Sequence, residues 1–195
     1  MFDILIREKK WRDRYFNLKF RDMIKPYLRG SKKHLDFGCG FGCFAYLLSK
    51  DYPRMKVIGT DIDKEAVREG RKRYKRKNLK LVVEDKIIGK YTSISCCFTL
   101  HELTNPKKYI REFYRHLENN GIILVYDFRK VGKRKFIKWY TKRRYIQESF
   151  EKTYRKHCKW TPKELARMFE KVGFKMLKAK PISDYWCFYV GKKMS

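Results

Sequence analysis

The sequence predicts an α/β fold in which a doubly wound, mostly parallel sheet carries helices on both faces. Short apolar segments typical of buried strands alternate along the chain with longer segments of helical periodicity. A glycine-rich turn at residues 38–42 follows the first strand segment. Acidic residues stand where strands end, at Asp36, Asp61 and Asp85. In sheets of this kind, ligands bind beyond the carboxyl ends of the strands, so these residues are candidates for a binding site.

Seven strand segments are expected, each short and rich in apolar residues. In chain order they are 34–37, 55–60, 79–83, 91–98, 122–126, 174–178 and 185–190. Asn119-Asn120-Gly121 predicts a turn before the fifth of them.

The helices expected between these strands lie at 44–50, 64–77, 106–117 and 162–172. Asp63 is a good N-terminal cap for the second of them. Thr161-Pro162-Lys163-Glu164 combines a capping threonine, a proline at the first helical position and a glutamate at the third. This combination predicts a capping box at the start of the last helix.

The organisation expected is one domain with two additions. Residues 1–30 form an N-terminal amphipathic helical segment, since apolar residues recur at helical spacing over 4–29 and Gly30 ends it. Residues 31–195 form the main domain, and residues 129–160 interrupt its strand–helix rhythm as a basic insertion. No segment approaches the length of a membrane-spanning helix, and the N-terminal apolar run is too short for a signal peptide, so a cytoplasmic protein is expected.

The charge balance is strongly one-sided. The chain of 195 residues has 50 Lys and Arg against 21 Asp and Glu, a formal net charge of +29. Such a field favours a polyanionic partner, either nucleic acid, an anionic membrane surface or an acidic small molecule. The alternative is a lysine-rich surface that only faces solvent. The six cysteines have no zinc or iron–sulfur spacing, so buried thiols and no metal site are predicted.

The turn Asp36-Phe37-Gly38-Cys39-Gly40-Phe41-Gly42 is the most informative motif. Alternating glycines let a ligand lie against the backbone. A dinucleotide fingerprint would have its third glycine at position 43, which is Cys43 here. The carboxylate of Asp36 disfavours a phosphate and favours a ligand with a cationic or hydrogen-bond-donating group.

With its flanking strand, this motif resembles the first motif of the class I S-adenosylmethionine-dependent methyltransferases. The resemblance implies a Rossmann-like sheet of seven strands whose last strand is antiparallel. It implies that Asp36 orients the amino group of S-adenosylmethionine and that Gly38, Gly40 and Gly42 let its methionine part pass.

Two further segments are similar to the next motifs of that family, in the right order. Val57 to Asp63 matches the second motif and Val82 to Asp85 the third. The resemblance implies that Asp61 binds both ribose hydroxyls, that Ile62 lies against the adenine and that Asp85 faces the adenine amino group.

After the fourth strand, Phe98 to Leu103 is similar to methyltransferases of small molecules and lipid quinones. His101 is the candidate catalytic base, with Glu102 beside it; a packing role for His101 is the alternative. Where the family often has an acid opening this strand, the chain has Thr92 or Ser93. Cys96-Cys97 lacks the proline of cytosine-modifying enzymes and is interpreted as a buried strand pair.

In similar enzymes the position of residues 129–160 carries a cap over the acceptor pocket. Here the cap combines basic side chains with aromatic ones. This pattern favours RNA, either tRNA or rRNA, as the methyl acceptor. The candidate acceptor-binding residues are Lys133, Arg134, Trp139, Arg143 and Arg144. Three alternatives stay open: a solvated amphipathic helix, an anionic small molecule or lipid as acceptor, and a non-catalytic RNA-binding or partner-activating module. The sequence does not predict an oligomeric state.

Overall fold

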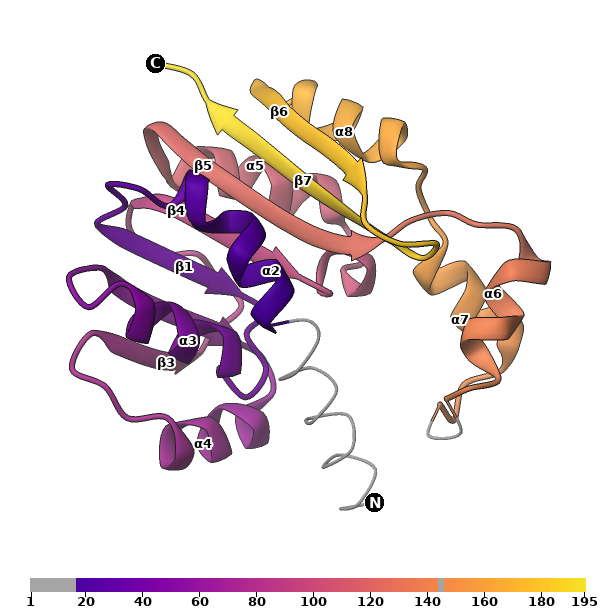
Figure 1. The fold of residues 1–195 in the computed structure, drawn as a ribbon, viewed down its shortest axis with the longest axis horizontal. Helices are drawn as coiled ribbons and strands as arrows, with labels where there is room; N and C mark the ends of the chain where they lie inside the picture. Colours follow the sequence, from indigo (N-terminus) through magenta and orange to yellow (C-terminus); the bar gives the residue numbers. More distant parts are fainter. Residues whose placement is uncertain (1–16, 144–145) are drawn as a thin grey trace.

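The computed structural model describes residues 17–143 and 146–195. A seven-stranded sheet with the order β3-β2-β1-β4-β5-β7-β6 forms the centre of the molecule (Figure 1). β7 is antiparallel to both of its neighbours, and the other neighbouring pairs are parallel. The strands are β1 (Lys33–Phe37), β2 (Lys56–Asp61), β3 (Leu79–Val83), β4 (Tyr91–Cys97), β5 (Leu117–Phe128), β6 (Phe174–Pro181) and β7 (Trp186–Lys193). The predicted fold class is confirmed.

Helices cover both faces of the sheet (Figure 1). One face carries α2 (Asn17–Ile24), α3 (Cys43–Asp51) and α4 (Lys64–Arg73); α5 (Pro106–His116) and α8 (Pro162–Glu170) cover the other. The first core contains Phe20, Phe44 and Phe188, and the second contains Phe113 and Phe169. Because successive side chains of a strand point to opposite faces, Leu35 and Phe37 of β1 enter the second core while His34 and Asp36 point the other way.

The N-terminal segment is described only from Asn17 onward, so the expectation for residues 1–16 lies outside the described residues. α2 is followed by the short 3₁₀ helix η2 (Lys25–Tyr27), which contains Pro26. Phe20, Ile24 and Leu28 of this segment are buried against the domain. Within the described ranges, no helix is long and apolar enough to span a lipid bilayer.

Several boundaries differ from the predictions; for example, β6 and β7 each continue three residues beyond their predicted ends, to Pro181 and Lys193. α4 ends at Arg73 rather than at residue 77, because Tyr74 adopts an extended backbone and stacks its ring on Tyr46 of α3, with centroids 4.9 Å apart. β5 begins at Leu117, before the predicted turn. The turn is present as an irregularity inside the strand, where Asn120 has a φ of 62° and the register to β4 shifts.

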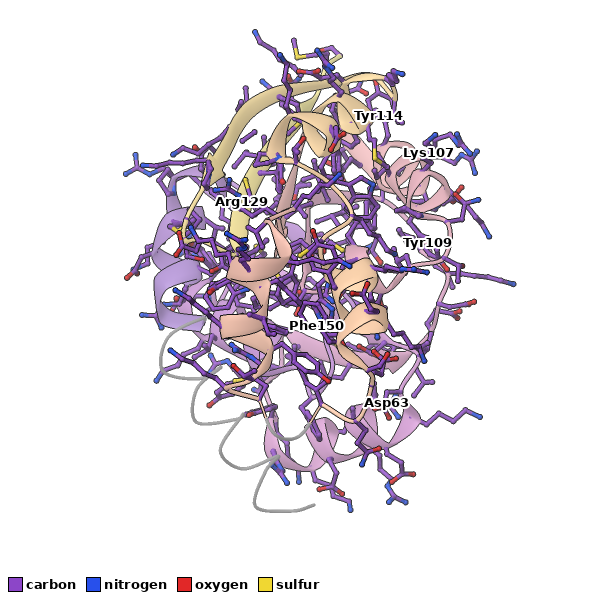
Figure 2. All side chains as sticks on the ribbon, turned by 90° about the vertical axis from the view of Figure 1, so that its right-hand side faces the viewer. Asp63, Lys107, Tyr109, Tyr114, Arg129 and Phe150 are labelled. Carbon is purple, nitrogen blue, oxygen red and sulfur yellow. The ribbon has the colours of Figure 1, made fainter. Side chains whose placement is uncertain are left out.

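The insertion contributes α6 (Lys133–Tyr140) and α7 (Phe150–His157) beyond the carboxyl end of β5 (Figure 1). Their facing sides form a small apolar core of their own. Phe136 and Phe150 pack across it at 6.1 Å between ring centroids, and Figure 2 shows Phe150 between the two helices. We call the described residues 129–143 and 146–160 the cap.

Candidate active site

The glycine turn follows β1 where the strand order of the sheet reverses. Gly38, Gly40 and Gly42 all have positive φ, at 73°, 52° and 77°. The Asp61 carboxylate holds the turn from β2, because its Oδ2 accepts the Gly40 N–H at 2.7 Å and its Oδ1 accepts the Asp63 N–H at 2.9 Å. Asp61 therefore fixes the turn and keeps further lone pairs for a ligand.

A chain of buried polar side chains runs between β1 and β4 and ends at Asp36. His34 Nδ1 lies 2.8 Å from the Ser93 hydroxyl, and His34 Nε2 lies 2.9 Å from the Ser95 hydroxyl. Ser95 donates to Asp36 Oδ1 at 2.7 Å. The Ser95 hydroxyl donates its only hydrogen to Asp36, so it must accept a hydrogen bond from His34 Nε2–H. This requirement fixes which nitrogen of the His34 imidazole carries the hydrogen.

Burial dominates the ionisation of both titratable groups in this chain. It lowers the pKa of His34 to about 3, so the ring is neutral. Burial also raises the pKa of Asp36 to about 7. The hydrogen bond from Ser95 lowers this pKa and the negative charge of Asp61 raises it, but burial is the largest effect. Asp36 therefore holds its proton up to a higher pH in the folded state than in the unfolded state. For this reason its contribution to the free energy of unfolding falls as the pH rises from about 4 to about 7.

The pKa of Asp36 predicts a pH-dependent affinity for a ligand with an ammonium group. S-adenosylhomocysteine should bind roughly tenfold more tightly at pH 7 than at pH 5.5, because only the ionised carboxylate attracts the ammonium group. Calorimetric titration across this range measures the effect, below the pH at which an α-amino group itself titrates. Asp36→Asn should bind weakly and without this slope; a flat profile for the unchanged protein would contradict the role of Asp36.

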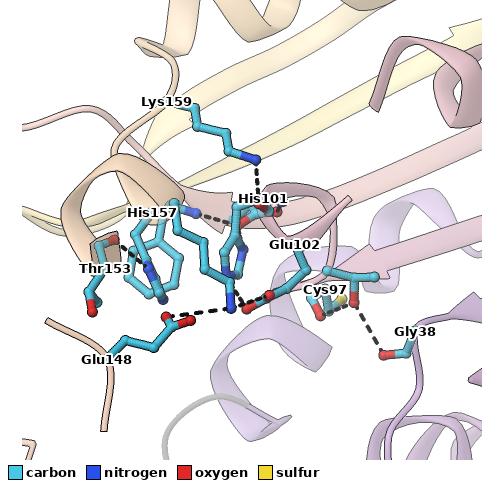
Figure 3. A network of polar contacts seen from close by, with 12 residues as sticks. Gly38, Cys97, His101, Glu102, Glu148, Thr153, His157 and Lys159 are labelled. Atoms are coloured by element: carbon cyan, nitrogen blue, oxygen red, sulfur yellow. Dashed lines mark hydrogen bonds and ion pairs between the residues drawn. The ribbon is translucent and has the colours of Figure 1, made fainter. Parts of the chain in front are cut away.

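The second part of the site is a pocket of about 380 Å³ between the sheet and the cap. Aromatic rings form much of its wall, namely Phe98, Phe128, Trp139, His157 and Trp186. Thr99 joins this pocket to the glycine turn, because it follows Phe98 and its hydroxyl lies within hydrogen-bond distance of the carbonyls of Gly38 (3.3 Å) and Cys97 (3.0 Å) (Figure 3).

His101 stands at the edge of the pocket in the 3₁₀ helix η3 (Leu100–Glu102) and is held from several sides. Asp127, at the end of β5, accepts its backbone N–H at 3.1 Å and its Nδ1–H at 2.6 Å. Lys159 of the cap donates to the His101 carbonyl at 2.7 Å. The Nε2 atom lies 3.1 Å from Glu102 Oε1. The imidazole is therefore fixed in one orientation, with Nε2 on the pocket side.

The charges around His101 favour its protonated form. Burial alone would lower the pKa of His101, but Asp127 and Glu102 outweigh it and raise the value to about 9. Burial would raise the pKa of Glu102, but hydrogen bonds from His101 and Lys156 lower it to about 2. At neutral pH this pair is thus an imidazolium beside a carboxylate, and it can orient a polar acceptor group.

The comparisons with known proteins agree with this geometry. A family model described as a methyltransferase domain matches residues 9–179. The chain belongs to the methyltransferase domain family. No curated protein sequence matches this methyltransferase significantly. S-adenosylmethionine as its methyl donor stays a prediction, which the family match supports.

Solved structures show that the fold is shared at low identity. A methyltransferase from Bacillus halodurans aligns with a TM-score of 0.70 and 17% identity, over 92% of this chain and 99% of that one. The magnesium protoporphyrin IX methyltransferase from Synechocystis, with bound S-adenosylhomocysteine, aligns with a TM-score of 0.70 and 13% identity. This alignment covers 91% of this chain and 83% of that one. A methyltransferase from Haloferax volcanii in complex with the Trm112 activator aligns with a TM-score of 0.71 and 15% identity. This alignment covers 97% of this chain and 93% of that one.

The residues near the glycine turn fit the methyl donor. A Cβ added to Gly40 would meet no atom within 4 Å, so the turn has free space at the point where the methionine part is expected. Ile62 is 73% exposed directly after Asp61, as a side chain that an adenine ring would cover. Asp85 is also exposed, after β3. The cofactor roles of Asp36, Asp61, Ile62 and Asp85 stay predictions that these positions support.

The cap residues of the methyltransferase lie in different surroundings. Trp139 is buried and lines the pocket, and the Arg143 guanidinium lies 4.0 Å from the centroid of its ring. Lys133 is exposed and pairs with Glu151 at 2.6 Å. Arg134 is exposed, and Arg144 lies outside the described residues. Trp139 and Arg143 thus belong to the pocket, while Lys133 and Arg134 belong to the outer surface.

Sequence reasoning missed His157, which the fold brings beside His101 with ring centroids 4.6 Å apart. It identified His101 as the candidate base, but not the hydrogen bond that joins His101 to Asp127. Cys96 and Cys97 both lie in β4, but only Cys96 is fully buried as predicted, while Cys97 is half-buried; desolvation raises the pKa of both thiols well above the usual value. Such thiols are poor nucleophiles.

Proposed function

We propose that this protein methylates RNA, with one base of a tRNA or rRNA held in the pocket beneath the cap. The observation that carries the proposal is the combination of an aromatic pocket next to the methyl-donor site with an unpaired cationic surface above it. RNA has the matching chemistry, since its bases stack on aromatic rings and its phosphates bind cations.

The pocket supports a flat acceptor group. Its volume of about 380 Å³ suits one base-sized ring, and enzymes that modify bases take them out of the stack into such pockets. Among the described residues, the buried Trp139 Nε1–H has no hydrogen-bond acceptor. A carbonyl oxygen of the acceptor would satisfy this donor.

The outer surface of the cap supports a polyanion. Arg134, Lys138, Lys142 and Arg155 are exposed, and within the part of the chain that the structure describes no carboxylate pairs with them. By contrast, Lys133, Lys135 and Lys152 each have a carboxylate partner. The unpaired group is therefore available for phosphates.

The chemistry requires little beyond positioning. When bound, S-adenosylmethionine supplies a methyl group on an activated sulfonium. Asp36 and Asp61 would fix the donor at the turn, while His101 and Glu102 would orient the attacking atom of the acceptor.

The six cysteines are all free in the structure, which fits the cytoplasmic location that we expect.

The unpaired cap cations predict a specific change in the salt dependence of RNA binding. Replacing Arg134, Lys138 and Lys142 together with Ala should reduce the slope of log K against log salt by about two to three, because each phosphate contact contributes about 0.7–0.9. Filter binding to unfractionated tRNA measures this slope. The matched control replaces Lys175, Lys178 and Lys180 of the edge strand β6 and removes the same charge. Equal losses in both variants would show only a general charge effect.

Tritiated methyl transfer into fractionated cell extract tests the acceptor class directly. Label in the RNA fraction, lost on ribonuclease treatment, is the expected result. Label in a small-molecule or lipid fraction would contradict the RNA proposal and identify the alternative acceptor.

A further inference from the structure

Three groups able to bind a metal converge where the cap meets the sheet. A nitrogen of His101, a carboxylate oxygen of Glu102 and a nitrogen of His157 all lie within 4.8 Å of one another (Figure 3). Two of these atoms, His101 Nε2 and Glu102 Oε1, are 3.1 Å apart. Ligands around a tetrahedral ion with bonds of about 2.0–2.1 Å stand roughly 3.4 Å apart, so only a small movement of His157 separates this cluster from coordination geometry.

Both imidazoles are held by their other nitrogen. His101 Nδ1 donates to Asp127 at 2.6 Å. His157 Nδ1 lies 2.8 Å from the Thr153 carbonyl, which can only accept, so this nitrogen carries the hydrogen. A metal ion bound here would displace the proton that His101 carries on Nε2, and the Nε2 atom of each ring would then be the one left to ligate it beside the Glu102 carboxylate. Metal-binding histidines characteristically donate their second nitrogen to a carboxylate or a carbonyl in this way.

We propose that His101, Glu102 and His157 bind a divalent first-row transition-metal ion of the Zn²⁺ type. Two imidazoles and one carboxylate are the ligand set of many catalytic zinc sites and of non-haem iron sites. The pocket on the open side leaves room for a further ligand, so a bound ion could hold an oxygen or nitrogen atom of the acceptor.

Lys156 shows that this point of the structure attracts positive charge. Its ammonium group pairs with Glu102 Oε2 at 2.5 Å and lies 3.9 Å from Glu148. This pairing uses Glu102 Oε2, whereas Oε1 is the oxygen that contacts the imidazole of His101. The ammonium group can therefore keep its contact with Glu102, or move to Glu148, when an ion takes the position between the histidines.

The test uses the full chain, dialysed against a chelator and then titrated with Co²⁺ and Zn²⁺ without RNA or methyl donor. Saturable binding of one ion per chain is expected, and Co²⁺ should develop the visible absorption bands of a four- or five-coordinate site with nitrogen ligands. The His157→Ala and Glu102→Gln variants should each bind about 100-fold more weakly. Asp127→Asn should weaken binding by about 10–100-fold through the orientation of His101.

His116 provides the matched control, since it also lies near a carboxylate, with Nε2 3.5 Å from Glu112 on the helix surface. His116→Ala should bind the ion as the unchanged protein does, and circular dichroism verifies that every variant is folded. Absence of one-to-one binding, or equal weakening by His116→Ala, would overturn the proposal. Because no RNA is present, these outcomes are independent of the acceptor.

Discussion

Asp61→Ala is expected to weaken the binding of S-adenosylhomocysteine by about 100-fold or more. The carboxylate has two functions that the alanine loses together. It accepts the backbone N–H groups of Gly40 and Asp63, which holds the glycine turn against β2. Its remaining lone pairs are those expected to accept the ribose hydroxyls, and hydrogen bonds to a charged group contribute about 1.5–3 kcal/mol each. Isothermal titration at constant pH measures the loss.

Asp63→Asn is the control for this experiment. It removes one negative charge two residues away, and the asparagine can still cap α4 through its side-chain oxygen, as Asp63 does for the Ala66 N–H at 3.0 Å. This variant should bind S-adenosylhomocysteine within a factor of about three of the unchanged protein. Unaltered binding by Asp61→Ala would refute the assignment of Asp61 to the cofactor.

Two glycines of the turn should respond differently to the same substitution. Gly38→Ala is expected to reduce the free energy of unfolding by about 3 kcal/mol or more, because its φ is 73° and the new Cβ would lie 2.2–2.7 Å from atoms of Thr99. Gly40→Ala should cost only about 1 kcal/mol for its positive φ, since its Cβ would meet no atom within 4 Å. That open space is where the methyl donor is expected, so Gly40→Ala should instead weaken cofactor binding by tenfold or more.

Urea denaturation and calorimetric titration of both variants separate the two effects. Gly38→Ala should lose stability first, and Gly40→Ala should lose affinity while it remains folded. If Gly40→Ala bound S-adenosylhomocysteine as tightly as the unchanged protein, the methyl donor would have to pass the turn elsewhere.

The fold could be predicted because each local signal depends on residues close together in the sequence. The capping box is present at Thr161 and Glu164, where the Thr161 hydroxyl accepts the Glu164 N–H at 3.2 Å. The glycine turn likewise needs only its own residues and the strand before it. Such features survive in a single sequence, since neighbouring residues impose the same backbone geometry wherever the segment packs.

The candidate acceptor site could be predicted only in part, because its contacts join distant segments. His157 reaches His101 only after the cap has folded back over β5, and no spacing along the chain indicates that approach. The chain from His34 to Asp36 was missed for a related reason. Ser93 and Ser95 are ordinary strand residues in the sequence, and they become hydrogen-bond partners only through the register between β1 and β4.

The position of Lys159 has a thermodynamic consequence. Lys159 donates to the His101 carbonyl from the cap, and His157 packs against the His101 ring, so the two walls of the pocket belong to segments that are joined by these contacts. A molecule that touches both walls must stabilise the docked cap, and a docked cap must by the same free energy increase the affinity for that molecule. Occupancy of the pocket and closure of the protein around it are in this sense one equilibrium.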